Sequence, residues 1–212
     1  MKAKFLALLC LVLALASASL AQTAAAPAPT PLTADEREAA LKSLQATRDA
    51  FLKSVAGLSE KQLKFKPAPD RWSVAEVSEH IAVSESMIFG MVQSKVMTSP
   101  VDPSKRAEVK MTDQQILTLI PDRSHKAQAP EFLKPTNRWP SEADVVKAFE
   151  DSRKATMDYV RTTNDDLRDH FGPHPALGTL DGYQWILLIS AHSERHTKQI
   201  EEVKADPNFP KD

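Results

Sequence analysis

Most of the chain consists of long segments in which apolar residues recur with the 3.6-residue spacing of an α-helix. Each segment opens with a residue that can cap a helix N-terminus, followed three positions later by a side chain that can return the bond. No segment alternates apolar and polar residues as a half-buried strand does. The sequence therefore predicts an all-α fold with no sheet. Long helices are expected at 33–56, 73–98, 141–162 and 181–205, with short helical turns opened by Ser59 and Thr112.

Four long helices are typical of a four-helix bundle. The link between the second and third of them, residues 99–140, contains six prolines. Connections of this length are uncommon inside compact domains and often cover a functional site. We therefore expect a long crossover connection over the bundle. Residues 163–180, before the last helix, are expected to form a second loop.

The N-terminus has the three-part layout of a secretory signal peptide. Two lysines precede an apolar run from Phe5 to Ala16, and Ser19-Leu20-Ala21 supplies the small residues of a cleavage site. The apolar run is shorter than the ~20 residues that span a bilayer, so stable membrane insertion is not expected after cleavage. The predicted location is periplasmic or secreted. The predicted parts are a signal peptide at 1–21, an Ala/Pro-rich tether at 22–32, the helical domain at 33–206 and a tail at 207–212.

Composition excludes several classes of function. Without the two leader lysines the chain has 25 basic and 28 acidic residues, a net charge of −3. A mildly acidic chain of this kind is not expected to bind nucleic acid. The single cysteine, Cys10, lies inside the leader, so the mature protein is expected to use neither disulfides nor thiolate chemistry. The expected partner is a small-molecule substrate, and a homodimer is possible.

Two histidines one helical turn apart stand out in the last helix. His192 and His196 lie at the centre of its apolar stripe, where a bundle helix usually has Leu or Ile. Their Cβ atoms should be ~5–6 Å apart, which lets both imidazoles reach one metal ion. The alternative is a pair of core histidines, each hydrogen-bonded to a carbonyl or carboxylate. The pattern alone leaves both interpretations open.

Other candidate residues lie nearby in the pattern. His80, on the flank of the apolar stripe of the second helix, could add a third nitrogen. Glu85 lies on that stripe itself and is a weaker candidate for a role in catalysis, in which it could accept a hydrogen bond from a ligand imidazole. The alternative is an ion pair, for instance with Arg195. His170 and His174, in the loop before the last helix, are weaker candidates for a general acid or base, with solvated loop histidines as the alternative.

Several motifs resemble the DinB-like family of four-helix-bundle metal proteins. Individually they have little specificity, but the combination is characteristic, and the resemblance extends from about Leu32 to Val203. The elements that carry it are Arg71-Trp72-Ser73 and Glu76 followed by Glu79-His80-Ile81, then Gly182-Tyr183-Gln184-Trp185, His192-Ser193-Glu194-Arg195-His196 and Gln199-Ile200, and the segment Pro130-Glu131-Phe132-Leu133-Lys134-Pro135 with Arg138-Trp139-Pro140.

The resemblance implies a DinB/YfiT-like bundle that binds one divalent metal through His80, His192 and His196. Three imidazoles leave a coordination position open for water, as in catalytic zinc sites. Zinc is the first expectation, while nickel, manganese and iron also suit such ligands. The expected activity is that of a metal-dependent hydrolase or transferase. Because the thiol cofactors of transferase members are cytosolic, export favours hydrolysis over thiol transfer.

The sequence also bears on two other classes of function. A non-catalytic bundle that binds a metal or small ligand remains open, because sequence alone does not show whether polar groups converge beside the metal. A ferritin-like di-iron protein requires Glu-x-x-His pairs on inward helix faces, and this sequence has none.

Overall fold

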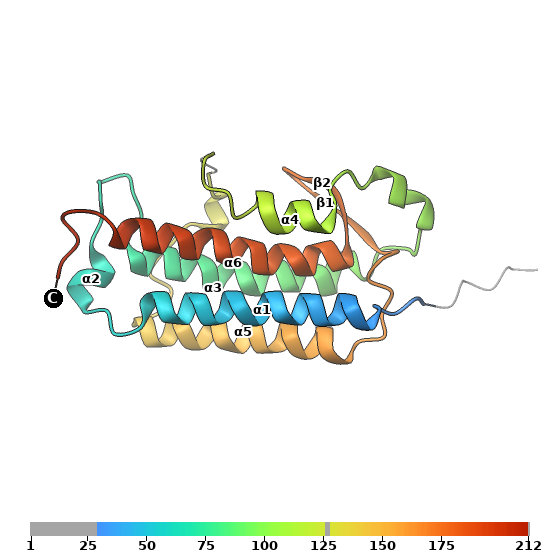
Figure 1. Cartoon of the computed structure of the whole chain (residues 1–212), viewed down its shortest axis with the longest axis horizontal. Coiled ribbons are helices and arrows are strands. Elements are labelled where there is room, and N and C mark those ends of the chain that lie inside the picture. Colours follow the sequence, from blue (N-terminus) through green and yellow to red (C-terminus); the bar gives the residue numbers. More distant parts are fainter. Residues whose placement is uncertain (1–28, 126–127, 212) are drawn as a thin grey trace, which may run out of the picture.

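The structure is a computed structural model and describes residues 29–125 and 128–211. Four long helices lie side by side (Figure 1) and confirm the predicted four-helix bundle. They are α1 (Ala34–Val55), α3 (Val74–Met91), α5 (Glu142–Thr162) and α6 (Gly182–Lys204). The shorter elements are α2 (Glu60–Lys64), a π-helical turn η1 (Val92–Val96), the 3₁₀ turns η2 (Pro103–Glu108) and η3 (Glu131–Leu133), α4 (Asp113–Leu119), and the strands β1 (Phe171–His174) and β2 (Gly178–Asp181).

The predicted start signals lie at the helix N-termini. Thr33, Ser73 and Asp181 each accept a hydrogen bond from the backbone N–H three residues later, and that residue's side chain bonds back to the cap. Such caps satisfy N–H groups that have no partner inside the helix. The second long helix differs from the prediction. Its α-helical part ends at Met91 and passes into the π-helical turn η1 instead of continuing to about Thr98.

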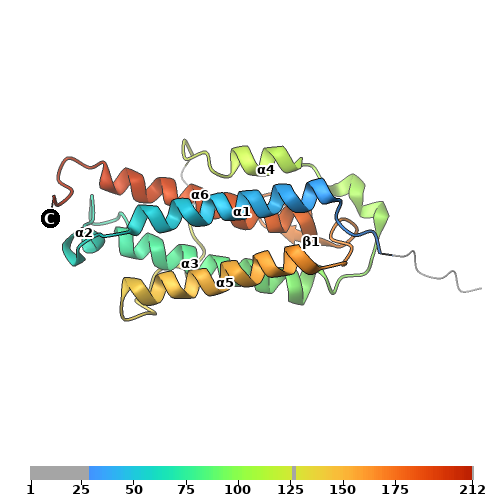
Figure 2. The same cartoon turned by 60° about the horizontal axis from the view of Figure 1, so that its bottom comes forward.

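The order of the helices explains the long connection. α1 and α6 run in one direction, and α3 and α5 run in the other (Figures 1 and 2). Because α3 and α5 are parallel neighbours, the chain must return along the bundle between them, and α3 alone is about 27 Å long. The returning segment carries α4, which packs against α6. The crossover predicted from the prolines therefore lies over α6.

The core consists of two apolar clusters with a polar layer between them. The first cluster includes Leu44, Phe89 and Ile189, and the second includes Phe51 and Ile81. Between these positions each long helix contributes at least one buried polar side chain, and Arg153 and Glu85 form an ion pair at the centre. The polar layer is the hydrogen-bonded set around this pair: Thr47 of α1, Glu85 of α3, Arg153 of α5 and Ser193 of α6.

The segment before α6 was predicted to be a loop in a fold without a sheet, and this prediction was wrong. β1 and β2 form an antiparallel hairpin in which Phe171 pairs with Asp181 and His174 with Gly178. Gly and Pro in the first strand are residues typical of turns, and four residues are too few to show alternation. The hairpin forms because its first strand packs closely against η1 and α6. A Cβ on Gly172 would lie 2.9 Å from Val96 Cγ2, so only glycine allows this close approach.

The chain ends bear on the predicted domain limits. The predicted signal peptide and most of the tether lie outside the described residues. Leu32 packs into the first apolar cluster. At the other end, the Phe209 ring lies against Phe65, with the ring centroids 5.5 Å apart. The limits at 33 and 206 stay a prediction. Within residues 29–125 and 128–211, no helix is both long enough and apolar enough to cross a membrane.

Candidate metal centre

The structure brings His80, His192 and His196 together where α3 faces α6. Each of them offers a ring nitrogen, and these three atoms all lie within 4.8 Å of one another. The ring centroids of His192 and His196 are 4.5 Å apart, and that of His80 lies 4.3 Å from that of His196. The turn-to-turn spacing on α6 follows from the sequence, whereas the approach of His80 depends on the packing of the two helices.

Hydrogen bonds orient two of the three rings. Nδ1 of His80 donates to the carbonyl oxygen of Leu133 at 2.9 Å. Nδ1 of His196 donates to Oε1 of Gln199 at 2.8 Å, and Arg123 donates to the same oxygen at 3.4 Å, which supports this amide orientation. Each ring therefore carries its proton on Nδ1. In both, Nε2 is left with a free lone pair.

These two lone pairs face each other. Nε2 of His80 and Nε2 of His196 are 3.2 Å apart. Two nitrogens bound tetrahedrally to one zinc ion at ~2.0–2.1 Å would be about 3.3 Å apart. The donor set, with three imidazoles, is also one that divalent transition metals bind. The residues present therefore fit a single divalent ion.

Burial keeps the three imidazoles neutral at neutral pH. Desolvation lowers the pKa of His192 to about 3, with further lowering by the neighbouring charges of His80, Arg195 and His174. Burial also holds the pKa of His196 well below its ordinary value. The pKa of His80 is lowered by burial, while its bond to Leu133 acts in the opposite direction. Only the neutral imidazole can ligate a metal, so this environment favours the binding form.

The structure places Glu85 in the polar layer. Its two oxygens accept hydrogen bonds from Arg153, and Ser193 also donates to one of them at 3.2 Å. The partner suggested by the sequence, Arg195, was wrong, since its guanidinium donates to carbonyl oxygens of the crossover, including those of Ile120 and His125. Both oxygens of Glu85 are thus occupied within the core. This does not support the suggestion that Glu85 accepts a bond from a ligand imidazole or takes part in catalysis.

Sequence reasoning did not identify Arg153. It lies four residues after Phe149 and four before Met157, both of which are buried on the same face of α5. An arginine at the centre of an apolar stripe must have a buried partner. The position of Arg153 on the apolar stripe of α5 could therefore have predicted a buried ion pair from the sequence.

His170 directly precedes β1 and His174 is the last residue of β1, and both lie outside the three-histidine group. His170 Nδ1 donates to the carbonyl oxygen of Ser99 at 2.7 Å, at the base of the hairpin. Its own carbonyl accepts from Gly182, which lies ten residues, or about 15 Å of helix, before His192. His170 therefore anchors the hairpin to the chain just after the π-helical turn.

His174 lies nearer to the centre. Its ring packs on Trp185, with the ring centroids 5.4 Å apart, and its charged form would lower the pKa of His192. Its Nδ1 accepts from the backbone N–H groups of Ala176 and Leu177, both at 3.2 Å. The ring proton is consequently on Nε2.

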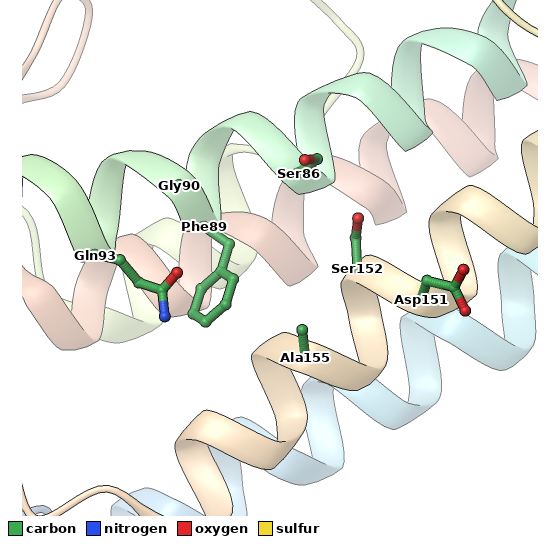
Figure 3. Close-up of a pocket in the computed structure, with 7 residues that line it drawn as sticks. All are labelled: Ser86, Phe89, Gly90, Gln93, Asp151, Ser152 and Ala155. Atoms are coloured by element: carbon green, nitrogen blue, oxygen red, sulfur yellow. The ribbon is translucent and has the colours of Figure 1, made fainter.

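An open groove on another face of the bundle is separate from this centre. It lies between α3 and α5 (Figure 3), and its lining combines small and polar side chains with one aromatic ring. The candidate histidines are not among the residues that line it. Those residues are Ser86, Phe89, Gly90, Gln93, Asp151, Ser152 and Ala155.

Two solved structures share this fold. YfiT from Bacillus subtilis, described as a probable metal-dependent hydrolase with an unusual four-helix bundle topology, gives a TM-score of 0.55 at 13% identity, over 84% of this chain and 91% of YfiT. TT2238, described as a four-helix bundle protein, gives 0.50 at 19% identity, over 78% of this chain and 98% of TT2238. At these identities the likeness shows the fold alone.

Sequence comparison shows the family. The chain is 26% identical over 148 residues to the protein YuaE of Bacillus subtilis (strain 168), covering 70% of this chain and 86% of YuaE. Residues 43–200, well over half of the chain, match the DinB superfamily, and this range includes all three histidines. The protein therefore belongs to the DinB superfamily.

Proposed function

We propose that the protein is a metal-dependent hydrolase whose divalent ion is held by His80, His192 and His196. The observation that carries the proposal is the 3.2 Å separation between Nε2 of His80 and Nε2 of His196, since the hydrogen bonds to Leu133 and Gln199 place the proton of each ring on Nδ1. Two lone pairs at this distance repel each other unless a cation lies between them. The description of YfiT, which has a similar fold, supports hydrolysis as the class of reaction.

A divalent ion held by three imidazoles supplies Lewis-acid chemistry for the attack of water on a carbonyl or phosphoryl group. Zinc is the ion we propose, because three neutral imidazoles are a common zinc ligand set. The protein's own residues then have separate tasks. Leu133 and Gln199 hold two of the rings in the binding tautomer. The Trp72 ring, 5.0 Å from that of His80, shields one side of the centre from water.

His174 is the candidate for contact with the substrate. Its Nδ1 is occupied by two backbone N–H groups, so its Nε2–H is a donor in a fixed orientation. A neutral imidazole of this kind can donate to negative charge that develops on the substrate oxygen. Burial lowers the pKa of His174, which keeps the ring in this neutral form.

The experiment is metal analysis of protein purified without added metal, combined with hydrolysis of chromogenic ester and phosphoester substrates. We expect one equivalent of divalent metal, and hydrolysis that is lost on chelation and restored by zinc. His192→Ala should remove both the metal and the activity. His125→Ala is the matched control and should retain both, because this histidine side chain is exposed and does not belong to the three-histidine group. His174→Gln should retain the metal and lose activity.

Two results would change the proposal. If the wild-type protein takes up no zinc at neutral pH, the proposed metal centre is wrong, and so is the proposed hydrolase activity that depends on it. Protein that binds one equivalent but hydrolyses none of the substrates would favour the alternative, a non-catalytic metal-binding bundle.

A further inference from the structure

A short segment of the crossover is fastened directly beside the histidine cluster. We call residues 130–139, which include the 3₁₀ turn η3, the strap. The strap contacts α3 at two consecutive residues, Glu79 and His80. One contact is the hydrogen bond from His80 to the Leu133 carbonyl, and the other is made by the Glu79 carboxylate.

The Glu79 carboxylate is buried and holds a turn of the strap. Oε1 accepts from the backbone N–H of Thr136 at 2.7 Å, and Oε2 accepts from that of Asn137 at 2.9 Å. Asn137 has a φ of 58°, the left-handed conformation in which successive N–H groups can point to the same side. Such a turn binds anions, and here the anion is a side chain of α3.

The strap is also tied together internally. Arg138 donates to the carbonyl oxygen of Phe132 at 2.9 Å and lies 3.7 Å from Oε1 of Glu79. Phe132 directly precedes Leu133, whose carbonyl accepts from His80. Displacing the turn from Glu79 would therefore also displace the Leu133 carbonyl.

We propose that Glu79 is a positioning residue for the metal centre. By docking the strap, it places the Leu133 carbonyl against Nδ1 of His80, which keeps Nε2 of His80 free and directed at His196. The inference rests on the proposed function, since it assumes that these rings hold an ion. Metal binding and strap docking should therefore stabilise each other. An ion on Nε2 of His80 would make its Nδ1–H a stronger donor, which would strengthen the hydrogen bond to the strap.

The test measures zinc affinity by chelator competition and amide hydrogen exchange in the strap by NMR, with and without zinc. In the wild type, zinc should slow exchange at Thr136 and Asn137. Glu79→Gln replaces one acceptor oxygen by an NH₂ group, so both amides should exchange at least about tenfold faster and zinc affinity should fall by about tenfold. Glu38→Gln, an exposed change of the same charge on α1, is the control and should behave as wild type.

A second pair of variants acts from the strap and leaves α3 unchanged. Asn137 is exposed, so substitution there does not disturb the core. Asn137→Val places a β-branched residue in the left-handed region and should weaken zinc binding, whereas Asn137→Gly tolerates that region and should not. If Glu79→Gln and Asn137→Val both weaken zinc binding, the cause is loss of strap docking and not a folding defect in α3, because Asn137→Val leaves α3 unchanged.

The outcomes are distinguishable from failure of the proposed function. If the wild type binds zinc and Glu79→Gln binds it with equal affinity, the positioning role is wrong while the metal centre stands. Zinc that leaves the Thr136 and Asn137 amides of the wild type unchanged would also refute the coupling. If the wild type binds no zinc, the proposed function fails, and exchange in the metal-free protein still reports whether Glu79 docks the strap.

Discussion

Replacing Arg153 with methionine tests whether the polar layer holds the bundle together. Arg153 and Glu85 are both fully buried at the side chain. The guanidinium donates to Glu85, to Thr47 and Ser193, both at 2.9 Å, and to the Leu44 carbonyl. One side chain therefore contacts all three of the other long helices. Methionine keeps an unbranched apolar stem and removes every donor.

The expected loss is large because Glu85 would remain buried without its counter-ion. Removing one partner of a buried ion pair costs about 3–5 kcal/mol. A domain of this size has a total free energy of unfolding of about 5–15 kcal/mol, so Arg153→Met should leave a marginally stable protein. Glu85→Leu combined with Arg153→Met removes both charges, and it should cost clearly less than the sum of the two single changes.

The assay is urea denaturation followed by the helical circular dichroism signal, in a chelator so that metal binding does not contribute. Arg48→Met is the matched control. Arg48 pairs with Glu150 at the surface, where both side chains are partly exposed, and its loss should cost no more than about 1 kcal/mol. The reasoning is wrong if Arg153→Met costs as little as Arg48→Met, or if the double variant loses the full sum of the single changes.

Two further predictions concern acid and the N-terminus. Burial holds the folded-state pKa values of His80, His192 and His196 below the unfolded value of about 6.5. The unfolded chain then binds more protons between these values, so the free energy of unfolding of the metal-free protein should fall as the pH drops below about 6.5. The slope should reach up to about 1.4 kcal/mol per pH unit for each histidine, and urea melts with equal midpoints at pH 7.5 and pH 5 would contradict it. We also expect mature protein to begin at or near Gln22, and mass spectrometry of the exported protein that finds Met1 retained would refute cleavage.

The structure confirms the sequence prediction best where the interactions are local. The cap at Asp181 and the side chain that returns to it are three residues apart, so a short stretch of sequence contains the whole interaction. The pairing of His192 with His196 is equally local, because four residues make one helical turn. The motifs around His80 and His196 pointed to the family, and the match over residues 43–200 shows it.

Sequence patterns did not predict contacts between distant parts of the chain. The strands of the hairpin are only four residues long, and one of them contains Gly172 and a proline, so local propensity favours a loop. The packing of the hairpin against Trp185 overrides that propensity. The sequence offered Arg195 of α6 as one possible ion-pair partner of Glu85, whereas the partner in the structure is Arg153 of α5, 68 residues away along the chain.

The starts of the long helices, their assembly into a four-helix bundle and the two imidazoles on one helix face could all be predicted from sequence patterns. What those imidazoles face depends on how distant parts of the chain pack together. His80 lies 116 residues before His196, and the carbonyl that orients it belongs to the strap, 53 residues further along the chain. Every residue type has the same backbone carbonyl, so the sequence does not show which carbonyl accepts the hydrogen bond from His80. Only the packing of helices and crossover can bring it to the imidazole, because hydrogen bonds act over a few ångströms of space, whatever the separation along the chain.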